Sequence, residues 1–173
     1  MKPIEHNILG FEYSARGRET FQAIDPATGA PLEGNFVSAT EEEVDEALKK
    51  ARRAFASYRN AEPALRARFL RAIAEELEGI ADALVGRVMS ETALPEGRVR
   101  GELGRTTFQL RLFAQLVEEG SYVEAVIDHG DPQRAPLPKP DVRRRMVALG
   151  PVVVFTASNF PLAFSTAGGD TAS

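Results

Sequence analysis

A run of four apolar residues near the end of the sequence constrains the fold more than any other feature. Val152-Val153-Val154-Phe155 is mostly β-branched, follows Gly150-Pro151 and precedes small polar residues. Such a run is typical of a strand that is buried on both faces of a parallel sheet and needs neighbouring strands. Pro161 suits the first position of a helix, so residues 150–173 predict a strand, a loop and a helix. In open α/β sheets that junction lies at the carboxyl end of the strand, where ligands bind.

Helical periodicity dominates the middle of the chain. Thr40-Glu41-Glu42-Glu43 matches a capping box, and apolar residues recur at helical spacing over residues 44–58. A second helix is predicted to begin at Pro63 and to break at Gly79, and a third spans residues 96–119. The residues predicted to face inward on the third are Val99, Leu103, Thr106, Leu110, Phe113 and Val117.

Short strands are predicted on either side of these helices. Residues 20–24 form a strand that a turn at 25–29 ends, and residues 31–37 are expected to pair back with it. Residues 121–128 and 142–149 alternate as two strands of a hairpin joined by a proline-rich loop. Residues 1–18 hold scattered apolar side chains and are predicted to be irregular.

Composition and charge exclude several classes of function. Apolar residues make up 43% of the chain, charged residues 27%, and the net charge is −4, so nothing indicates nucleic-acid binding. The sequence shows neither a long apolar run nor a signal-peptide pattern, so no membrane span is predicted and a cytoplasmic location is expected. Cysteine is absent, and His6 and His129 stand alone, so no disulfide, thiol chemistry or metal site is expected.

Residues 150–173 read Gly-Pro-Val-Val-Val-Phe-Thr-Ala-Ser-Asn-Phe-Pro-Leu-Ala-Phe-Ser-Thr-Ala-Gly-Gly-Asp-Thr-Ala-Ser. This stretch resembles the start of the cofactor-binding domain in the NAD(P)-dependent aldehyde dehydrogenase family. Most of that family has Pro-Trp-Asn-Phe-Pro where this chain has Ala157-Ser158-Asn159-Phe160-Pro161. The variant Ser-Asn-Phe-Pro-Leu-Ala-Phe-Ser is similar to the branch that oxidises 2-oxoglutarate semialdehyde (2,5-dioxovalerate).

The resemblance covers nearly all 173 residues and implies an α/β fold, the N-terminal portion of the aldehyde dehydrogenase fold. It implies strands and helices of the cofactor-binding domain over residues 1–120 and a bridging hairpin of a homo-oligomer over residues 121–149. Residues 150–173 are implied to be the truncated first strand, loop and helix of a Rossmann-like parallel sheet, in which Gly168-Gly169 lets the helix pack closely. That family attacks the aldehyde with a cysteine thiolate, and this chain contains no cysteine. The chain is therefore expected to be the N-terminal part of a longer subunit.

The same resemblance assigns candidate site residues. Asn159 is implied as the residue whose amide stabilises the negative oxygen formed on the aldehyde, although an asparagine at this place is also common turn chemistry. Phe160 and Phe164 are implied to line the aldehyde tunnel, and their alternative is a simple core role. The residues implied to lie along the nicotinamide half of NAD or NADP are Phe155, Thr156, Ala157 and Ser158.

The predicted helix over residues 96–119 carries a candidate for substrate recognition, because in the family it runs beside the substrate tunnel. A remote carboxylate needs a cation to orient it, and arginine offers a planar fork. Arg105 is the first candidate and Arg111 the second, and the alternative is a surface arginine in an ion pair. In the preceding loop Ala93 stands where the family usually has glycine. If that glycine takes a positive φ, the loop here is expected to turn differently.

The functional prediction is therefore an NAD(P)-dependent aldehyde dehydrogenase, with 2-oxoglutarate semialdehyde as the favoured substrate and with this stretch alone inactive. The alternative is a non-catalytic helical module for interaction or oligomerisation, and a small nucleotide-binding domain ranks last. The choice between NAD and NADP and the identity of the aldehyde stay open.

Overall fold

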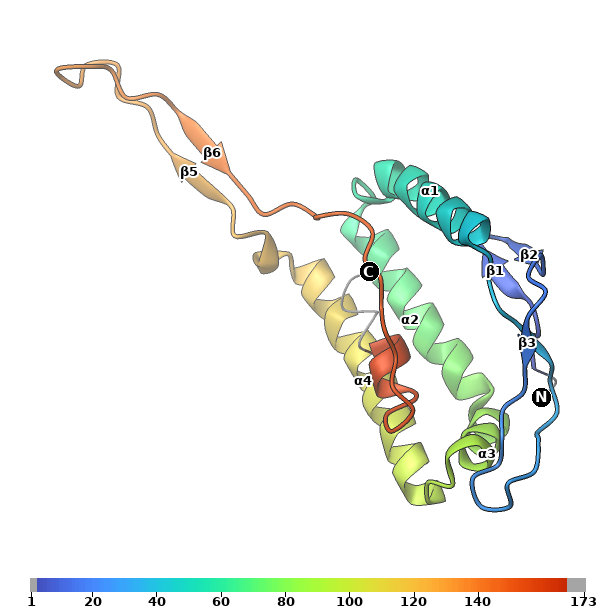
Figure 1. The fold of residues 1–173 in the computed structure, drawn as a ribbon. Helices are drawn as coiled ribbons and strands as arrows, with labels where there is room; N and C mark the ends of the chain where they lie inside the picture. Colours follow the sequence, from blue (N-terminus) through green and yellow to red (C-terminus); the bar gives the residue numbers. More distant parts are fainter. Residues whose placement is uncertain (1–2, 168–173) are drawn as a thin grey trace.

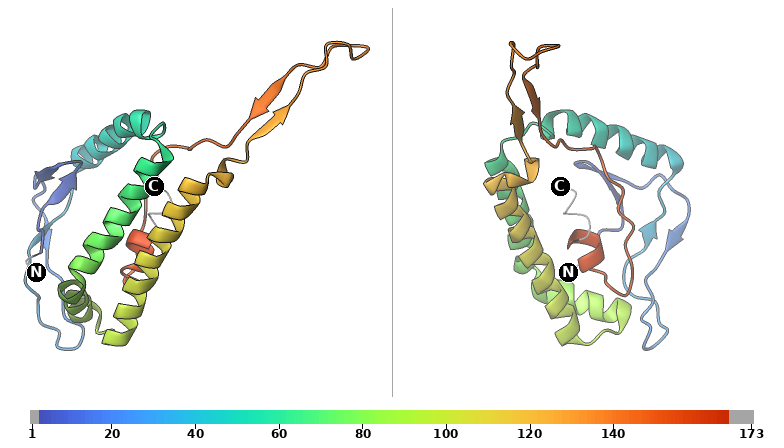
Figure 2. Two further views of the ribbon diagram at one scale, coloured as in Figure 1. Left: turned by 180° about the vertical axis from the view of Figure 1, so that it is seen from behind. Right: turned by 90° about the vertical axis from the view of Figure 1, so that its left-hand side faces the viewer.

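The structure, a computed structural model, describes residues 3–167. Four α-helices form the body of the described chain: α1 (Glu41–Tyr58), α2 (Pro63–Gly79), α3 (Ala81–Thr92) and α4 (Glu96–Glu119). The strands within residues 3–167 pair antiparallel in twos: β1 (Asn7–Leu9) with β2 (Glu12–Ser14), β3 (Thr20–Phe21) with β4 (Phe36–Val37), and β5 (Val126–Asp128) with β6 (Val142–Arg144). α2 and α4 lie side by side, while the β5–β6 hairpin projects away from the helices (Figure 1, Figure 2).

The core lies between α4 and the two helices before it. Ala67, Leu70 and Ala74 of α2 are buried against Leu110 and Ala114 of α4, and the three alanines let the helices approach closely. A second buried cluster joins α3 to the first half of α4 and includes one residue from near the C-terminus. Its members are Val85, Val88, Val99, Leu103 and Leu162. The first half of α4 therefore anchors the segment that follows Asn159.

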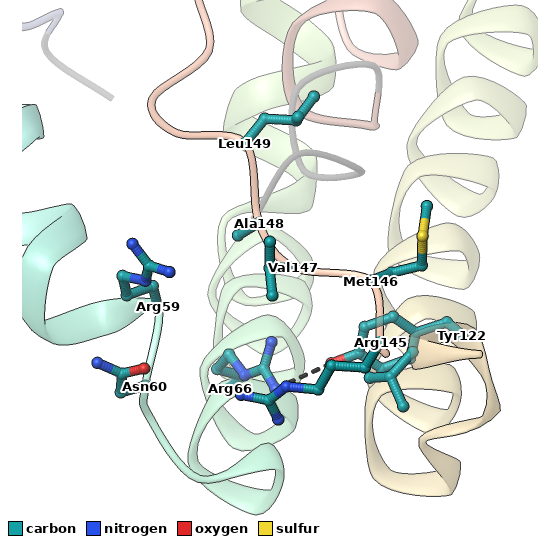
Figure 3. Close-up of a pocket in the computed structure, with 10 residues that line it drawn as sticks. Arg59, Asn60, Arg66, Tyr122, Arg145, Met146, Val147, Ala148 and Leu149 are labelled. Atoms are coloured by element: carbon teal, nitrogen blue, oxygen red, sulfur yellow. Dashed lines mark hydrogen bonds between the residues drawn. The ribbon is translucent and has the colours of Figure 1, made fainter. Parts of the chain in front are cut away.

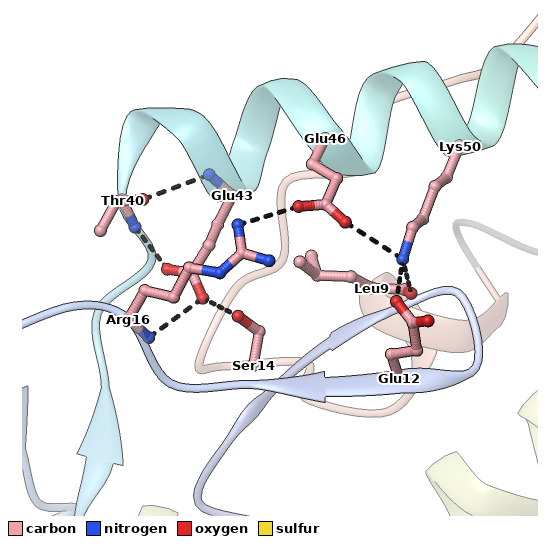
Figure 4. A network of polar contacts seen from close by, with 8 residues as sticks. All are labelled: Leu9, Glu12, Ser14, Arg16, Thr40, Glu43, Glu46 and Lys50. Carbon is pink, nitrogen blue, oxygen red and sulfur yellow. Dashed lines mark hydrogen bonds and ion pairs between the residues drawn. The ribbon is translucent and has the colours of Figure 1, made fainter.

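A polar network holds the start of α1 against the β1–β2 hairpin (Figure 4). Glu43 accepts a hydrogen bond from the backbone N–H of Thr40 at 2.8 Å, while its own N–H donates to the Thr40 hydroxyl at 3.2 Å. The same carboxylate accepts from the hydroxyl of Ser14 and from the backbone N–H of Arg16. These hydrogen bonds lower the pKa of Glu43 to about 2, and the bond from Ser14 has the largest effect. The capping box predicted from the sequence is thus also a tertiary contact.

The predicted helices are confirmed. Their starts at Glu41, Pro63 and Glu96 and the break at Gly79 agree with the sequence. The predicted inward residues of α4 are buried, apart from the half-buried Phe113. The pairing of the first predicted strands is confirmed by the β3–β4 register and by a bridge from Ile24 to Pro31.

Three predictions about strand extent were wrong. Residues 1–18 are not all irregular, because Gly10 (φ 71°) turns the chain so that β1 and β2 can pair. At the other end of the helices, residues 121–123 form the 3-10 turn η1 (Ser121–Val123) rather than a strand, since Gly120 (φ 82°) and Glu124 (φ 44°) bend the chain on both sides. β6 ends at Arg144, short of the predicted residue 149.

The strand predicted over Val152–Phe155 is absent from the structure. No strand within residues 3–167 lies beside this segment, and Val153 is 63% and Phe155 is 90% exposed. A strand is stable only when its backbone groups pair with a neighbour, so without one the segment stays extended and irregular. The expected helix after Pro161 is present as a short π-helix, η2 (Ala163–Ala167). Gly168 and Gly169 lie outside the described residues.

The loop between α3 and α4 corrects another expectation. Ala93 itself adopts the left-handed conformation, with φ 55° and ψ 19°, at the C-terminal end of α3. Its N–H donates to the carbonyl of Met89 at 2.9 Å. The loop therefore has a positive φ at this position even though alanine replaces glycine. That conformation is strained for a residue with a Cβ.

Candidate functional site

The loop at Asn159 is held against the first half of α4. The backbone carbonyl of Asn159 accepts a hydrogen bond from Nη2 of Arg98 at 3.1 Å. The same guanidinium lies over the ring of Phe160, 4.5 Å from its centroid, which is a cation–π contact. The ring of Phe160 lies 4.8 Å from that of Phe164. Arg98 therefore fixes the main chain at Asn159 and the ring that follows it.

A shallow groove of about 300 Å³ runs along this face of α4. It is lined by Gly97, Arg98, Gly101, Glu102, Arg105 and Phe160. A side chain added at Gly97 or Gly101 would meet open space, so these glycines leave the groove floor uncovered. The polar residues are spaced four and three apart, which places them on one side of the helix.

Arg105 and Arg111 have different surroundings. Arg111 makes a two-pronged ion pair with Glu78 of α2, with N–O distances of 2.7 and 2.8 Å. The guanidinium of Arg105 is exposed in the groove, and no hydrogen bond or ion pair engages it within residues 3–167. The ion-pair alternative therefore describes Arg111, and Arg105 is the cation of the two that is available to a ligand.

The remaining predicted site residues lie in the segment on either side of Phe160. Asn159 is exposed, and no partner among residues 3–167 holds its side-chain amide. Phe164 is 42% exposed beside Phe160. The residues predicted to contact nicotinamide, Phe155 to Ser158, form an extended segment that leads into the Asn159 loop and is exposed apart from the half-buried Ala157. The structure thus places Arg105 in one groove with Phe160, the residue after Asn159, and Phe164 packs beside Phe160. Asn159 itself is not among the residues that line this groove, and the preceding segment is exposed.

Two residues of this site were missed from the sequence. Arg98 lies on the outer side of the predicted helix, and nothing in the local pattern links it to a residue 61 positions away. Glu102 had a detectable signal, because it falls within the inward stripe between Val99 and Thr106 and is buried. A carboxylate at such a position needs a buried donor, and that requirement could have marked it.

Comparison with known proteins adds the decisive observation. The model of the family described as "Aldehyde dehydrogenase family" matches residues 13–168. The chain belongs to the aldehyde dehydrogenase family. The match includes every described residue of the groove and of the Asn159 loop.

Individual relatives in the family agree with this assignment. "Alpha-ketoglutaric semialdehyde dehydrogenase 2" of Azospirillum brasilense is 50% identical over 167 residues, which are 96% of this chain and 32% of that protein. "Alpha-ketoglutaric semialdehyde dehydrogenase" of Acinetobacter baylyi is 45% identical, over 91% of this chain and 30% of that protein. The crystal structure of HpcC from Thermus thermophilus superposes with a TM-score of 0.80 at 30% identity, over 98% of this chain and 31% of that one. The chain thus spans about a third of the length of these relatives.

A second cavity, of about 360 Å³, lies between the end of α1, the start of α2 and the segment after β6 (Figure 3). Arg59, Arg66 and Arg145 line it, and Arg66 donates to the hydroxyl of Tyr122 at 2.9 Å. None of the site residues predicted from the family resemblance lines this cavity.

Two features are absent from residues 3–167. These residues contain no group of histidine, aspartate and glutamate side chains that could hold a metal ion. None of their helices is long and apolar enough to cross a bilayer.

Proposed function

We propose that this chain is part of an aldehyde dehydrogenase that oxidises 2-oxoglutarate semialdehyde to the dicarboxylic acid. The family match and the two relatives named for alpha-ketoglutaric semialdehyde, at 50% and 45% identity, support the reaction and the substrate. The observation that carries the proposal is the Asn159 loop, which Arg98 holds beside a groove that contains the unpaired cation Arg105.

Asn159 is assigned the stabilisation of negative charge. Oxidation of an aldehyde through a covalent thiohemiacetal develops a negative charge on oxygen, and a fixed amide N–H lowers that barrier. Loss of one such donor costs about 10²–10³ in rate, whereas loss of a nucleophile costs on the order of 10⁶. Because the sequence contains no cysteine, the 173-residue chain alone is expected to be inactive. Production of NAD(P)H by the purified chain with any aldehyde would contradict this.

NAD or NADP is the proposed cofactor, and it would accept the hydride from the substrate. The segment Phe155 to Ser158 fits one side of such a group. Its backbone N–H groups have no hydrogen-bond partner within residues 3–167, and only the carbonyl of Ala157 is engaged there, by the N–H of Phe160 at 3.2 Å. These residues are proposed to contact the nicotinamide half through their backbone.

The proposed role of Arg105 is to hold the remote carboxylate of the substrate. Replacement of Arg105 by alanine in the complete enzyme should lower kcat/KM for 2-oxoglutarate semialdehyde about 10- to 100-fold, because a hydrogen bond to a charged group is worth about 1.5–3 kcal/mol. Activity with pentanal, which has the same chain length and no carboxylate, should stay within about twofold. Steady-state kinetics with both aldehydes measures this.

The matched control is Arg111→Ala, which removes a guanidinium already held by Glu78. It should leave the ratio of the two specificity constants unchanged. Equal losses for both aldehydes in Arg105→Ala would contradict the assignment, and a loss confined to the semialdehyde in Arg111→Ala would move the role to that residue.

A homo-oligomer bridged by the β5–β6 hairpin is also proposed. The hairpin projects from the helices, and every residue of both strands is exposed, as a subunit contact would require (Figure 1). Sedimentation equilibrium of the complete enzyme tests this, and a monomer at micromolar concentration would contradict it.

A further inference from the structure

Glu102 is a buried acid whose hydrogen bonds reach the segment after Asn159. The residue is 6% exposed, and its Oε1 accepts from the backbone N–H of Leu162 at 2.8 Å and of Ala163 at 2.9 Å. Both of these residues are themselves buried. η2, the short red helix in Figure 1 and Figure 2, lies beside α4.

The carboxylate of Glu102 is only partly compensated by its surroundings. Its neighbours in the inward stripe, Val99, Leu103 and Thr106, are uncharged, and no cation pairs with it within residues 3–167. Its Oε2 is buried there without a hydrogen-bond partner. At a buried position, an apolar residue usually contributes as much to stability as a charged one. A buried charge is therefore of most use where it fixes one particular arrangement of the chain.

That arrangement is the position of Asn159. Arg98 holds the carbonyl of Asn159, and Glu102, one turn further along α4, holds the N–H groups of the third and fourth residues after it. The only residues between these anchors are Phe160, whose ring is under the Arg98 guanidinium, and Pro161, whose φ is fixed by its ring. The backbone from the carbonyl of Asn159 to Ala163 is therefore held against one helix at both of its ends.

We propose that Glu102 is a positioning residue that sets the position of the main chain from which the Asn159 amide projects. The inference rests on the proposed function, since Asn159 must act in the reaction for its position to matter. A displacement of about 1 Å in a group that meets the transition state can cost about 10²-fold in rate. The carboxylate acts through the backbone and has no need to touch the substrate.

The test uses four variants of the complete enzyme: Glu102→Ala, Glu102→Gln, Asn159→Ala and the double variant Glu102→Ala/Asn159→Ala. Glu102→Ala should lower kcat about 10- to 100-fold, while the KM values for the aldehyde and for NAD or NADP stay within about threefold of those of the parent. Glu102→Gln keeps an oxygen acceptor of the same reach and should stay within about threefold of the parent. The double variant should be no slower than Asn159→Ala, within about threefold, because the two residues act as a unit.

Glu102→Asp serves if the alanine variant does not fold. It keeps the charge but withdraws the carboxylate by one methylene, so its kcat should fall below that of Glu102→Gln. Val117→Ala is the control for lost stability, because Val117 is buried two helical turns beyond Leu110 on the same face of α4, away from the groove. It should lower the unfolding temperature and leave kcat unchanged.

The outcomes separate the two proposals. Parent-like kcat in Glu102→Ala, or a double variant slowed by the product of the single effects, overturns the positioning role while a slow Asn159→Ala keeps the proposed function. Parent-like kcat in Asn159→Ala overturns both. If Glu102→Asp has a higher kcat than Glu102→Gln, the negative charge matters rather than the length of the side chain, and the positioning role is overturned.

Discussion

Two buried glutamates show what a single residue contributes to this chain. Glu43 is fully buried, and its role at the start of α1 follows from the sequence, because its partner Thr40 is three residues away. Glu102 is also enclosed, but the N–H groups that it binds are 60 and 61 residues along the chain. Local spacing in the sequence predicts the contact of Glu43 with Thr40. It does not predict the contacts of Glu102.

The lowered pKa of Glu43 predicts a dependence of stability on pH. Its ordinary value is 4.5, and hydrogen bonds from Ser14 and Thr40 lower it to about 2 in the folded chain. Between these values the unfolded state binds more protons than the folded one, so the free energy of unfolding falls as pH falls through this window. The contribution is complete above the unfolded pKa and is lost below the folded one.

Urea unfolding at about pH 5 and about pH 3 measures this effect, with Glu43→Gln as the control. The parent chain should lose more stability between the two conditions than the glutamine variant, which has no proton to bind. Equal losses in the two proteins would show that other carboxylates account for the whole dependence.

Ala93 predicts a stabilising substitution. Its φ of 55° is unfavourable for a residue with a Cβ, and glycine adopts this conformation without strain. Ala93→Gly should therefore raise the free energy of unfolding by about 0.5–1 kcal/mol, measured by urea denaturation.

The matched control for Ala93→Gly is Gly120→Ala. Gly120 ends α4 with φ 82°, and an added Cβ there would meet no atom, so its loss of about 1 kcal/mol would report the backbone conformation alone. A loss of stability in Ala93→Gly would mean that the alanine side chain contributes more than its strained φ costs.

At the scale of elements, α4 connects the fold to the candidate site. One face of this 24-residue helix packs on α2 and α3, and its first half also holds η2 and the Asn159 loop. The helix and its inward stripe were predictable because helical periodicity is a local property. The groove was not, since it depends on which distant segment settles on α4. Arg105 and Phe160 were named separately, and only the structure places them together.

The packing of α4 on α2 predicts a large effect at Leu110. Its side chain is completely buried beside Leu70 and Ala74, so Leu110→Ala should lower the free energy of unfolding by about 2–5 kcal/mol. Leu112, two residues along the same helix, is 50% exposed, and Leu112→Ala should change it by less than about 0.5 kcal/mol. Comparable losses in the two variants, measured by urea denaturation, would contradict the assignment of this face as core.

At the scale of the whole molecule, several apolar surfaces of the described chain lack a cover. Val44 and Leu48 on the apolar side of α1 are about half exposed, and the residues from Val152 to Phe155 are 40% to 90% exposed. The sequence predicted a buried strand for Val152 to Phe155 and helical spacing of apolar residues over residues 44–58, but burial requires a second surface. The relatives are about three times longer than the matched part, so in those proteins many more residues are present that can cover such surfaces.

The measurement that tests the account most directly is the turnover of 2-oxoglutarate semialdehyde by Asn159→Ala in the complete enzyme. Without the amide donor, kcat should fall about 10²–10³-fold while KM changes little. Asn60→Ala, the same chemical change at an exposed turn, should turn over like the parent. An Asn159→Ala enzyme with the kcat of its parent would contradict the central claim.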